Sequence, residues 1–178
     1  MTWTTFHRRG EILRSVIRTA DERRDATLPL DLDGVTETFG DALSLLAALQ
    51  LRWHTHLAGR IDRVLADEPL DLSAAVEDAW ADAADALPGV RMILDGYRSA
   101  PLDEEMGRAM VKATAKEHMM LAVMAGRSSV DDPAAASVGA RIEEAARLRH
   151  RGRPAAAPAH VAEERPGLLE RLKSVVAA

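Results

Sequence analysis

The sequence predicts an all-α protein, an antiparallel bundle of about four principal helices with shorter helices packed beside them. Apolar residues recur at steps of three and four over long stretches, which is the spacing of one face of a helix. Alanine, leucine, arginine and glutamate are abundant, and all four favour helix. With 178 residues, 47% of them hydrophobic, the chain can bury a core without disulfides or structural metals.

The most continuous apolar pattern runs from residue 35 to residue 66 and predicts one long helix. At 1.5 Å per residue this helix would be roughly 45 Å long, and other helices must cover its apolar face. Trp53 lies at the centre of this face and is expected to be buried. The predicted inner face comprises Val35, Phe39, Ala42, Leu43, Leu46, Leu49, Trp53, Leu57, Ile61 and Val64.

Two segments precede the long helix. A first helix is expected from a threonine cap at Thr4 or Thr5 to about Arg24. Residues 25–34 contain a proline and a glycine and are therefore expected to form a loop. The inner face of the first helix would hold Phe6, Leu13, Val16, Ile17 and Ala20.

Proline and cap residues divide the middle of the chain. Pro69 ends the long helix, and Asp71 or Ser73 can cap a third helix. Trp80 lies on the inner face of that helix and is also expected to be buried. A proline–glycine pair at residues 88–89 breaks the chain before a short fourth helix.

Two more helices complete the predicted bundle. The fifth begins after Pro101, with Asp103 as its cap, and ends near Gly126. A shorter sixth helix begins with Asp132 as its cap and ends by Arg151. The inner face of the fifth helix is predicted to contain Leu102, Met106, Met110, Ala113, Met120, Leu121 and Met124.

The end of the sixth helix carries the basic cluster of the sequence, residues 147–153. We interpret it as a solvated helix end, where positive charge is favourable, rather than as a phosphate-binding patch. Glu143 and Arg147 stand four residues apart in the order that supports a helix.

A change in composition divides the chain into three parts. Residues 1–150 form the predicted bundle domain. Residues 151–166 are rich in proline, alanine and arginine and are expected to be a flexible linker. Residues 167–178 regain helical spacing and predict a short amphipathic helix. Its apolar side comprises Leu168, Leu169, Leu172, Val175 and Val176.

The short C-terminal helix requires a surface that covers its apolar side. A helix of roughly ten residues does not persist alone in water. Its own bundle, a second copy of the chain or another protein must therefore cover it. Because the linker gives the segment reach, we hypothesise that it docks on another protein. A helix that folds back onto its own bundle is the alternative.

Charge and composition argue against several classes of function. The net charge is −5, and acidic residues dominate the body of the chain, which disfavours general binding to nucleic acid. The absence of cysteine excludes disulfides and thiolate sites. The longest uncharged stretch, residues 42–51, is too short to span a membrane. A soluble, cytoplasmic protein is expected.

The histidines lack the spacing of a metal site. Di-iron and hemerythrin-like bundles place ligands one helical turn apart, as Glu-x-x-His or His-x-x-x-His. Neither pattern occurs in this sequence. His54 and His56 lie about 200° apart around one helix axis, so they cannot share a metal. We therefore predict no metal site and no cofactor.

Four residues remain as candidates for binding a ligand. His7 and Glu11 lie one turn apart on the first helix, and a surface contact between them is the alternative. Glu117 falls on the inner face of the fifth helix, where a carboxylate needs a partner or stays protonated. Its neighbour His118 lies on a different face. The alternative for Glu117 is an ion pair with an arginine at the edge of the bundle.

Two functions fit these patterns. The first is a non-enzymatic protein that acts through protein–protein interaction or self-association, with the C-terminal helix as its docking element. The second is a bundle that binds a small ligand or a metal in an internal pocket near Glu117. Motifs for nucleophilic catalysis and for phosphate binding are absent from the sequence, so an enzyme has no positive support. Five methionines of the fifth helix are interpreted as core residues, and the alternative is that they line an adaptable pocket. They are Met106, Met110, Met119, Met120 and Met124.

Overall fold

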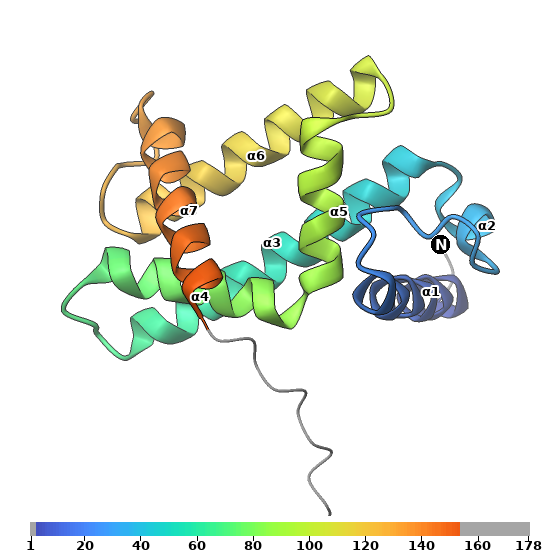
Figure 1. Cartoon of the computed structure of the whole chain (residues 1–178), viewed down its shortest axis with the longest axis horizontal. Coiled ribbons are helices and arrows are strands. Elements are labelled where there is room, and N and C mark those ends of the chain that lie inside the picture. Colours follow the sequence, from blue (N-terminus) through green and yellow to red (C-terminus); the bar gives the residue numbers. More distant parts are fainter. Residues whose placement is uncertain (1–2, 154–178) are drawn as a thin grey trace, which may run out of the picture.

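Seven α-helices make up residues 3–153, the part of the chain that the computed structural model describes, with side chains from His7 onward (Figure 1). No strand occurs among these residues, so the all-α prediction is confirmed. Most of the predicted linker and the whole predicted C-terminal helix lie outside the described residues. The helices are α1 (Trp3–Arg23), α2 (Val35–Phe39), α3 (Ala42–Ala66), α4 (Leu72–Ala86), α5 (Pro88–Ser99), α6 (Glu104–Met124) and α7 (Ala135–Gly152).

The stretch predicted as one long helix is two helices, α2 and α3. Gly40 turns the chain between them with a positive φ of 83°, a conformation that favours glycine. Asp41 then caps α3, because its side chain accepts a hydrogen bond from the Ser44 N–H at 2.7 Å. The prediction of a single helix is therefore wrong at Gly40. Its apolar face nevertheless continues across the break, since Val35 and Phe39 are buried with the α3 residues.

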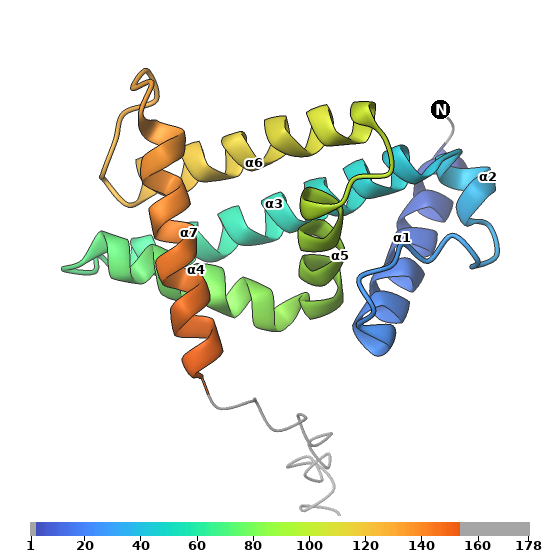
Figure 2. The same ribbon diagram turned by 45° about the horizontal axis from the view of Figure 1, so that its top comes forward.

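The core is organised around α3. Trp53 and Trp80 are buried, as predicted, and their rings meet edge to face with centroids 5.8 Å apart. Helix α4 packs along α3. Helix α5 runs across α3 and α6, whereas α7 runs across α6 and α4 (Figure 1). In both views α1 and α2 lie at the opposite end of the molecule from α7 (Figure 2).

Two of the four predicted caps, Asp71 and Asp103, are present. The other two predictions are wrong, because α1 already begins at Trp3, before Thr4 and Thr5, and α7 begins at Ala135 without a side-chain cap instead of at Asp132. The Asp71 side chain accepts from the Ala74 N–H at 3.0 Å at the start of α4, and Asp103 accepts from the Met106 N–H at 2.8 Å at the start of α6. Leu102 is 62% exposed, so its predicted place on the inner face of α6 is wrong and that face begins at Met106. No helix among residues 3–153 has the length and apolar character that a membrane span requires.

Helix α7 is a principal helix of the fold, although the sequence predicts a shorter accessory one. It has 18 residues and packs extensively against both α6 and α4. Its crossing with α6 depends on Gly139, because a Cβ atom there would lie 1.8 Å from the backbone oxygen of His118. The crossing brings Glu143, one turn further along α7, beside the His118 ring.

Replacing Gly139 by alanine is expected to lower the free energy of unfolding by roughly 1–3 kcal/mol, because the added Cβ forces α6 and α7 apart. Gly59, in the middle of α3, supplies the matched control, since no atom lies within 4 Å of the Cβ it would gain. Gly59→Ala should stabilise the protein by up to about 1 kcal/mol. Urea unfolding of the two variants measures the contrast, and equal stabilities would contradict the close crossing.

Candidate functional site

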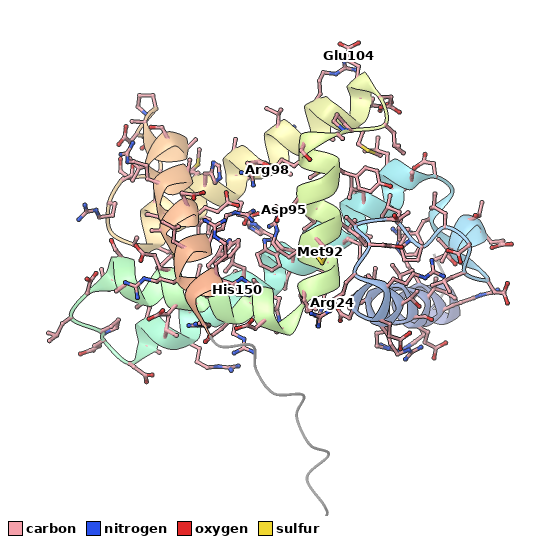
Figure 3. All side chains as sticks on the ribbon, in the orientation of Figure 1. Arg24, Met92, Asp95, Arg98, Glu104 and His150 are labelled. Atoms are coloured by element: carbon pink, nitrogen blue, oxygen red, sulfur yellow. The ribbon has the colours of Figure 1, made fainter. Side chains whose placement is uncertain are left out.

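A network of buried and half-buried charged side chains lies where α5, α6 and α7 meet. Charged groups are rarely buried unless they are paired, so the partners of each group decide what the network does. Figure 3 shows two members, Asp95 and Arg98, directed from α5 toward α7. The network comprises Arg91, Asp95 and Arg98 of α5, Glu117 and His118 of α6, and Glu143 and Arg147 of α7.

Glu143 is the centre of this network. Its carboxylate accepts hydrogen bonds from Arg98 at 2.9 Å, from Arg147 at 2.7 Å and from His118 at 2.5 Å. Burial alone would raise the pKa of this carboxyl, but hydrogen bonds from His118 and Arg98 and the charge of Arg147 outweigh burial. They hold the pKa of Glu143 well below its usual range. Glu143 is therefore ionised at neutral pH.

Asp95 extends the network along α5. Its carboxylate pairs with Arg147 at 2.6 Å and with Arg91 at 2.8 Å. Burial raises the pKa of Asp95, but the hydrogen bond from Arg147 and the charge of Arg91 lower it below its usual range. Arg147 consequently bridges Asp95 and Glu143, and these ion pairs tie α7 to α5.

Arg91 and Glu117 connect the network to the tryptophans of the core. The Glu117 Oε1 atom accepts hydrogen bonds from Trp80 Nε1 at 3.3 Å and from Arg91 at 3.4 Å. The Arg91 guanidinium lies over the Trp53 ring, 4.7 Å from its centroid. Arg147 lies over the Trp80 ring in the same way, at 4.9 Å. The positive charges of the network thus face both carboxylates and aromatic rings.

The four candidate ligand residues lie in two separate places. Glu117 and His118 both belong to the buried network, although they bond different partners. The ion pair predicted between Glu117 and an arginine is present, but its partner Arg91 is buried and the pair lies inside the fold instead of at its edge. His7 and Glu11 are exposed on α1, which does not contact α6 within the described residues. No group of His, Asp and Glu in residues 3–153 has the arrangement of a metal site.

The basic cluster at residues 147–153 lies at the end of α7, where Arg151 is 62% exposed, in keeping with the interpretation as a solvated helix end. Three of its side chains also contact the acidic face of α4. These contacts hold the last turn of α7 against α4. They join Arg149 to Glu77 at 2.7 Å, His150 to Asp85 at 2.9 Å and Arg153 to Asp82 at 2.6 Å.

An open apolar groove of about 400 Å³ lies between α3 and α6. It exists because α6 packs mainly against α7 and makes few contacts with α3. Aliphatic residues of both helices line it, among them Leu43 and Leu51 of α3 and Met110 and Ala113 of α6. Leu51 is 68% exposed, so the groove is accessible from outside the molecule. The sequence does not predict this groove.

The groove continues toward the C-terminal end of α6. A second hollow of about 240 Å³ shares His54 and Lys116 with the first and is lined by Met119, Met120 and Met124. Methionine side chains are flexible and polarisable, which suits a surface that adapts to a partner. The methionines of α6 therefore serve in two ways. Met106 and Met110 belong to the core, Met110 also lines the first hollow, and Met119, Met120 and Met124 line the second.

The two features of the described residues have different roles. In the buried network the charges neutralise one another and hold α5, α6 and α7 together, which is a structural role. The groove between α3 and α6 is open to another molecule.

No known protein family matches the chain, and neither a curated protein nor a solved structure is similar to it.

Proposed function

We propose that this protein is a non-enzymatic interaction module that receives an amphipathic α-helix of another protein in the groove between α3 and α6. The observation that supports the proposal is the length and apolar lining of the groove, two adjoining hollows of about 400 and 240 Å³. An amphipathic helix places side chains at steps of three and four into such a groove. Accessible apolar surface of this kind is characteristic of interaction sites.

Charge at the groove indicates the chemistry of the partner. Lys112 and Lys116 line it on α6, and His54 lines it on α3. Within residues 3–153 neither lysine forms an ion pair. A partner helix with acidic residues beside its apolar stripe would bring opposite charge to these lysines, which favours both its orientation and its rate of association.

The second function predicted from the sequence, an internal ligand or metal site near Glu117, has less support. The Glu117 carboxylate already accepts hydrogen bonds from Trp80 and Arg91, and Glu117 does not line the groove. A ligand there would have to replace both hydrogen bonds, at the cost of leaving buried polar groups unpaired. The cytoplasmic location expected from the cysteine-free composition is part of the proposal and rests on the sequence alone.

Substitution of Leu51 by a photo-reactive amino acid is expected to yield a cross-link to a partner protein, because this exposed side chain lies in the groove. The cross-linked segment, synthesised as a peptide, should bind the purified full chain. Leu51→Glu should weaken this binding by at least roughly tenfold, since a carboxylate then faces the apolar side of the peptide. Fluorescence anisotropy of the labelled peptide measures the change.

Leu70 provides the matched control for Leu51. It is also an exposed leucine, but it lies in the loop between α3 and α4 and does not line the groove. Leu70→Glu should leave the affinity for the peptide unchanged. A peptide that binds the Leu51→Glu and Leu70→Glu variants equally well would show that the groove is not the binding site.

A further inference from the structure

We propose that, in the free protein, the chain's own C-terminal segment, residues 167–178, occupies the groove between α3 and α6. The inference rests on the proposed function, because it requires the groove to be a docking site for an amphipathic helix. It selects the bundle of the same chain among the three surfaces that the sequence leaves open for this segment. A partner's helix then competes with the segment for one surface.

The segment can reach the groove from the end of α7. The His150 ring, in the last turn of α7, lies 6.4 Å from the Trp80 ring, which lies 5.8 Å from the Trp53 ring. His54, the next residue, lines the groove. These contacts place the His150 ring no more than about 12 Å from the Trp53 ring, measured through the core. The 13 residues 154–166, which would have to pass over the surface, span up to about 43 Å. A tether of this length gives an effective concentration near the millimolar range.

The apolar side of the segment matches the groove in length and chemistry. As a helix, the stretch from Leu168 to Val176 would extend about 12 Å, and the part of α6 from Ala109 to Lys116 that lines the first hollow extends about 11 Å. Leucine and valine side chains would then face leucine, alanine and methionine. Docking would cover Leu51, which is otherwise largely exposed to water.

The two ends of the groove differ in charge. Lys116 and His54 lie where the first and second hollows join. The opposite end begins at Leu43 of α3 and Ala109 of α6. Near these two positions lie the exposed acidic residues Asp41, Glu104 and Glu105 and one exposed basic residue, Arg108, which pairs with Glu104.

The charges of the segment fit this polarity in one direction. Glu163, Glu164 and Arg165 precede the segment, and Glu170, Arg171 and Lys173 lie within it, so the net charge changes from −1 to +1 along the chain. A segment that enters at Lys116 and runs antiparallel to α3 and α6 brings the net negative charge to the basic end and the net positive charge to the acidic end.

Methionine methyl NMR of the full-length chain tests this placement, because Met110, Met119, Met120 and Met124 line the groove and Met92 of α5 does not. Leu172→Glu, in the middle of the apolar side of the segment, should shift the groove methionine signals and leave the Met92 signal in place. Ser174→Glu adds the same charge on the opposite side of the predicted helix and should leave all of these signals unchanged.

The result that overturns the inference is a set of groove methionine signals that does not respond to Leu172→Glu. A response that grows with protein concentration would also overturn it, because a second copy would then supply the segment. The proposed function is tested separately, by measuring the binding of the partner peptide to the Leu51→Glu variant. Where both hold, Leu172→Glu should tighten binding of the partner peptide by roughly tenfold, since the competing segment has been removed.

Discussion

Replacing Glu143 with glutamine is expected to lower the free energy of unfolding by about 3 kcal/mol at neutral pH. The substitution removes the carboxylate shared by Arg98, His118 and Arg147 and leaves these donors around a neutral amide. Breaking a buried ion pair typically costs about 3–5 kcal/mol. The lower end applies here because the Arg98 side chain is 33% exposed and water can solvate it. Urea unfolding at pH 7 measures the loss.

The cost of Glu143→Gln should also depend on pH. The partners of Glu143 hold its pKa in the folded protein below that of an unfolded chain, which is about 4.3. Its contribution to stability is therefore complete above about pH 5 and is lost progressively as the pH falls below about 4. The stabilities of wild type and Glu143→Gln should converge in this acid range. A difference that stays constant from neutral to acid pH would contradict the ionised state of Glu143.

Glu144 supplies the control for the charge itself. It is the next residue on α7, but its side chain is 63% exposed and pairs only with Arg151, at 3.3 Å, within the described residues. Exposed pairs of this kind contribute little. Glu144→Gln should change the free energy of unfolding by less than about 0.5 kcal/mol.

Replacing Trp53 by alanine is expected to cost about 3–5 kcal/mol, the range for truncating a large aromatic side chain in a core. Trp53 has no exposed surface, and its removal leaves a void beside Trp80. It also removes the ring beneath the buried Arg91 guanidinium. Chemical unfolding followed by circular dichroism, which does not depend on the lost fluorophore, gives the difference from wild type.

Leu51 is the control on the same helix. It lies two residues before Trp53 and is 68% exposed, so Leu51→Ala should change stability by less than about 0.5 kcal/mol. A loss below about 0.5 kcal/mol for Trp53→Ala would mean that the ring is not part of a packed core.

The buried network explains why the groove is open. Glu143 and Arg147 bind α7 to α5 and α6, and Gly139 lets α7 approach the backbone of α6. Helix α6 is therefore held on its α7 side and does not need to close against α3. The part of α3 that contains Leu51 keeps an apolar surface without a covering helix among the described residues. The same packing that stabilises the fold thus leaves the proposed binding groove accessible.

The helices themselves could be predicted from the sequence, because the signals that determine them are local. Apolar spacing identifies the buried side of a helix, and caps such as Asp71 and Asp103 mark where helices begin. The prediction of one continuous helix failed at Gly40. The apolar spacing continues through it, so spacing alone predicts one helix, whereas the positive φ of the glycine ends α2.

The candidate sites could not be predicted from the sequence, because their residues come from helices that are far apart in the chain. Spacing shows that Glu117 is on a buried side, but it does not identify the helix that covers that side. The partners of Glu143 illustrate the reason, since Arg98 and His118 stand 45 and 25 residues away along the chain. The groove depends on how closely two helices approach, which no local pattern encodes. Local patterns were therefore sufficient for most helices and their buried sides, whereas the charged network and the groove depend on packing between helices that are distant in the chain.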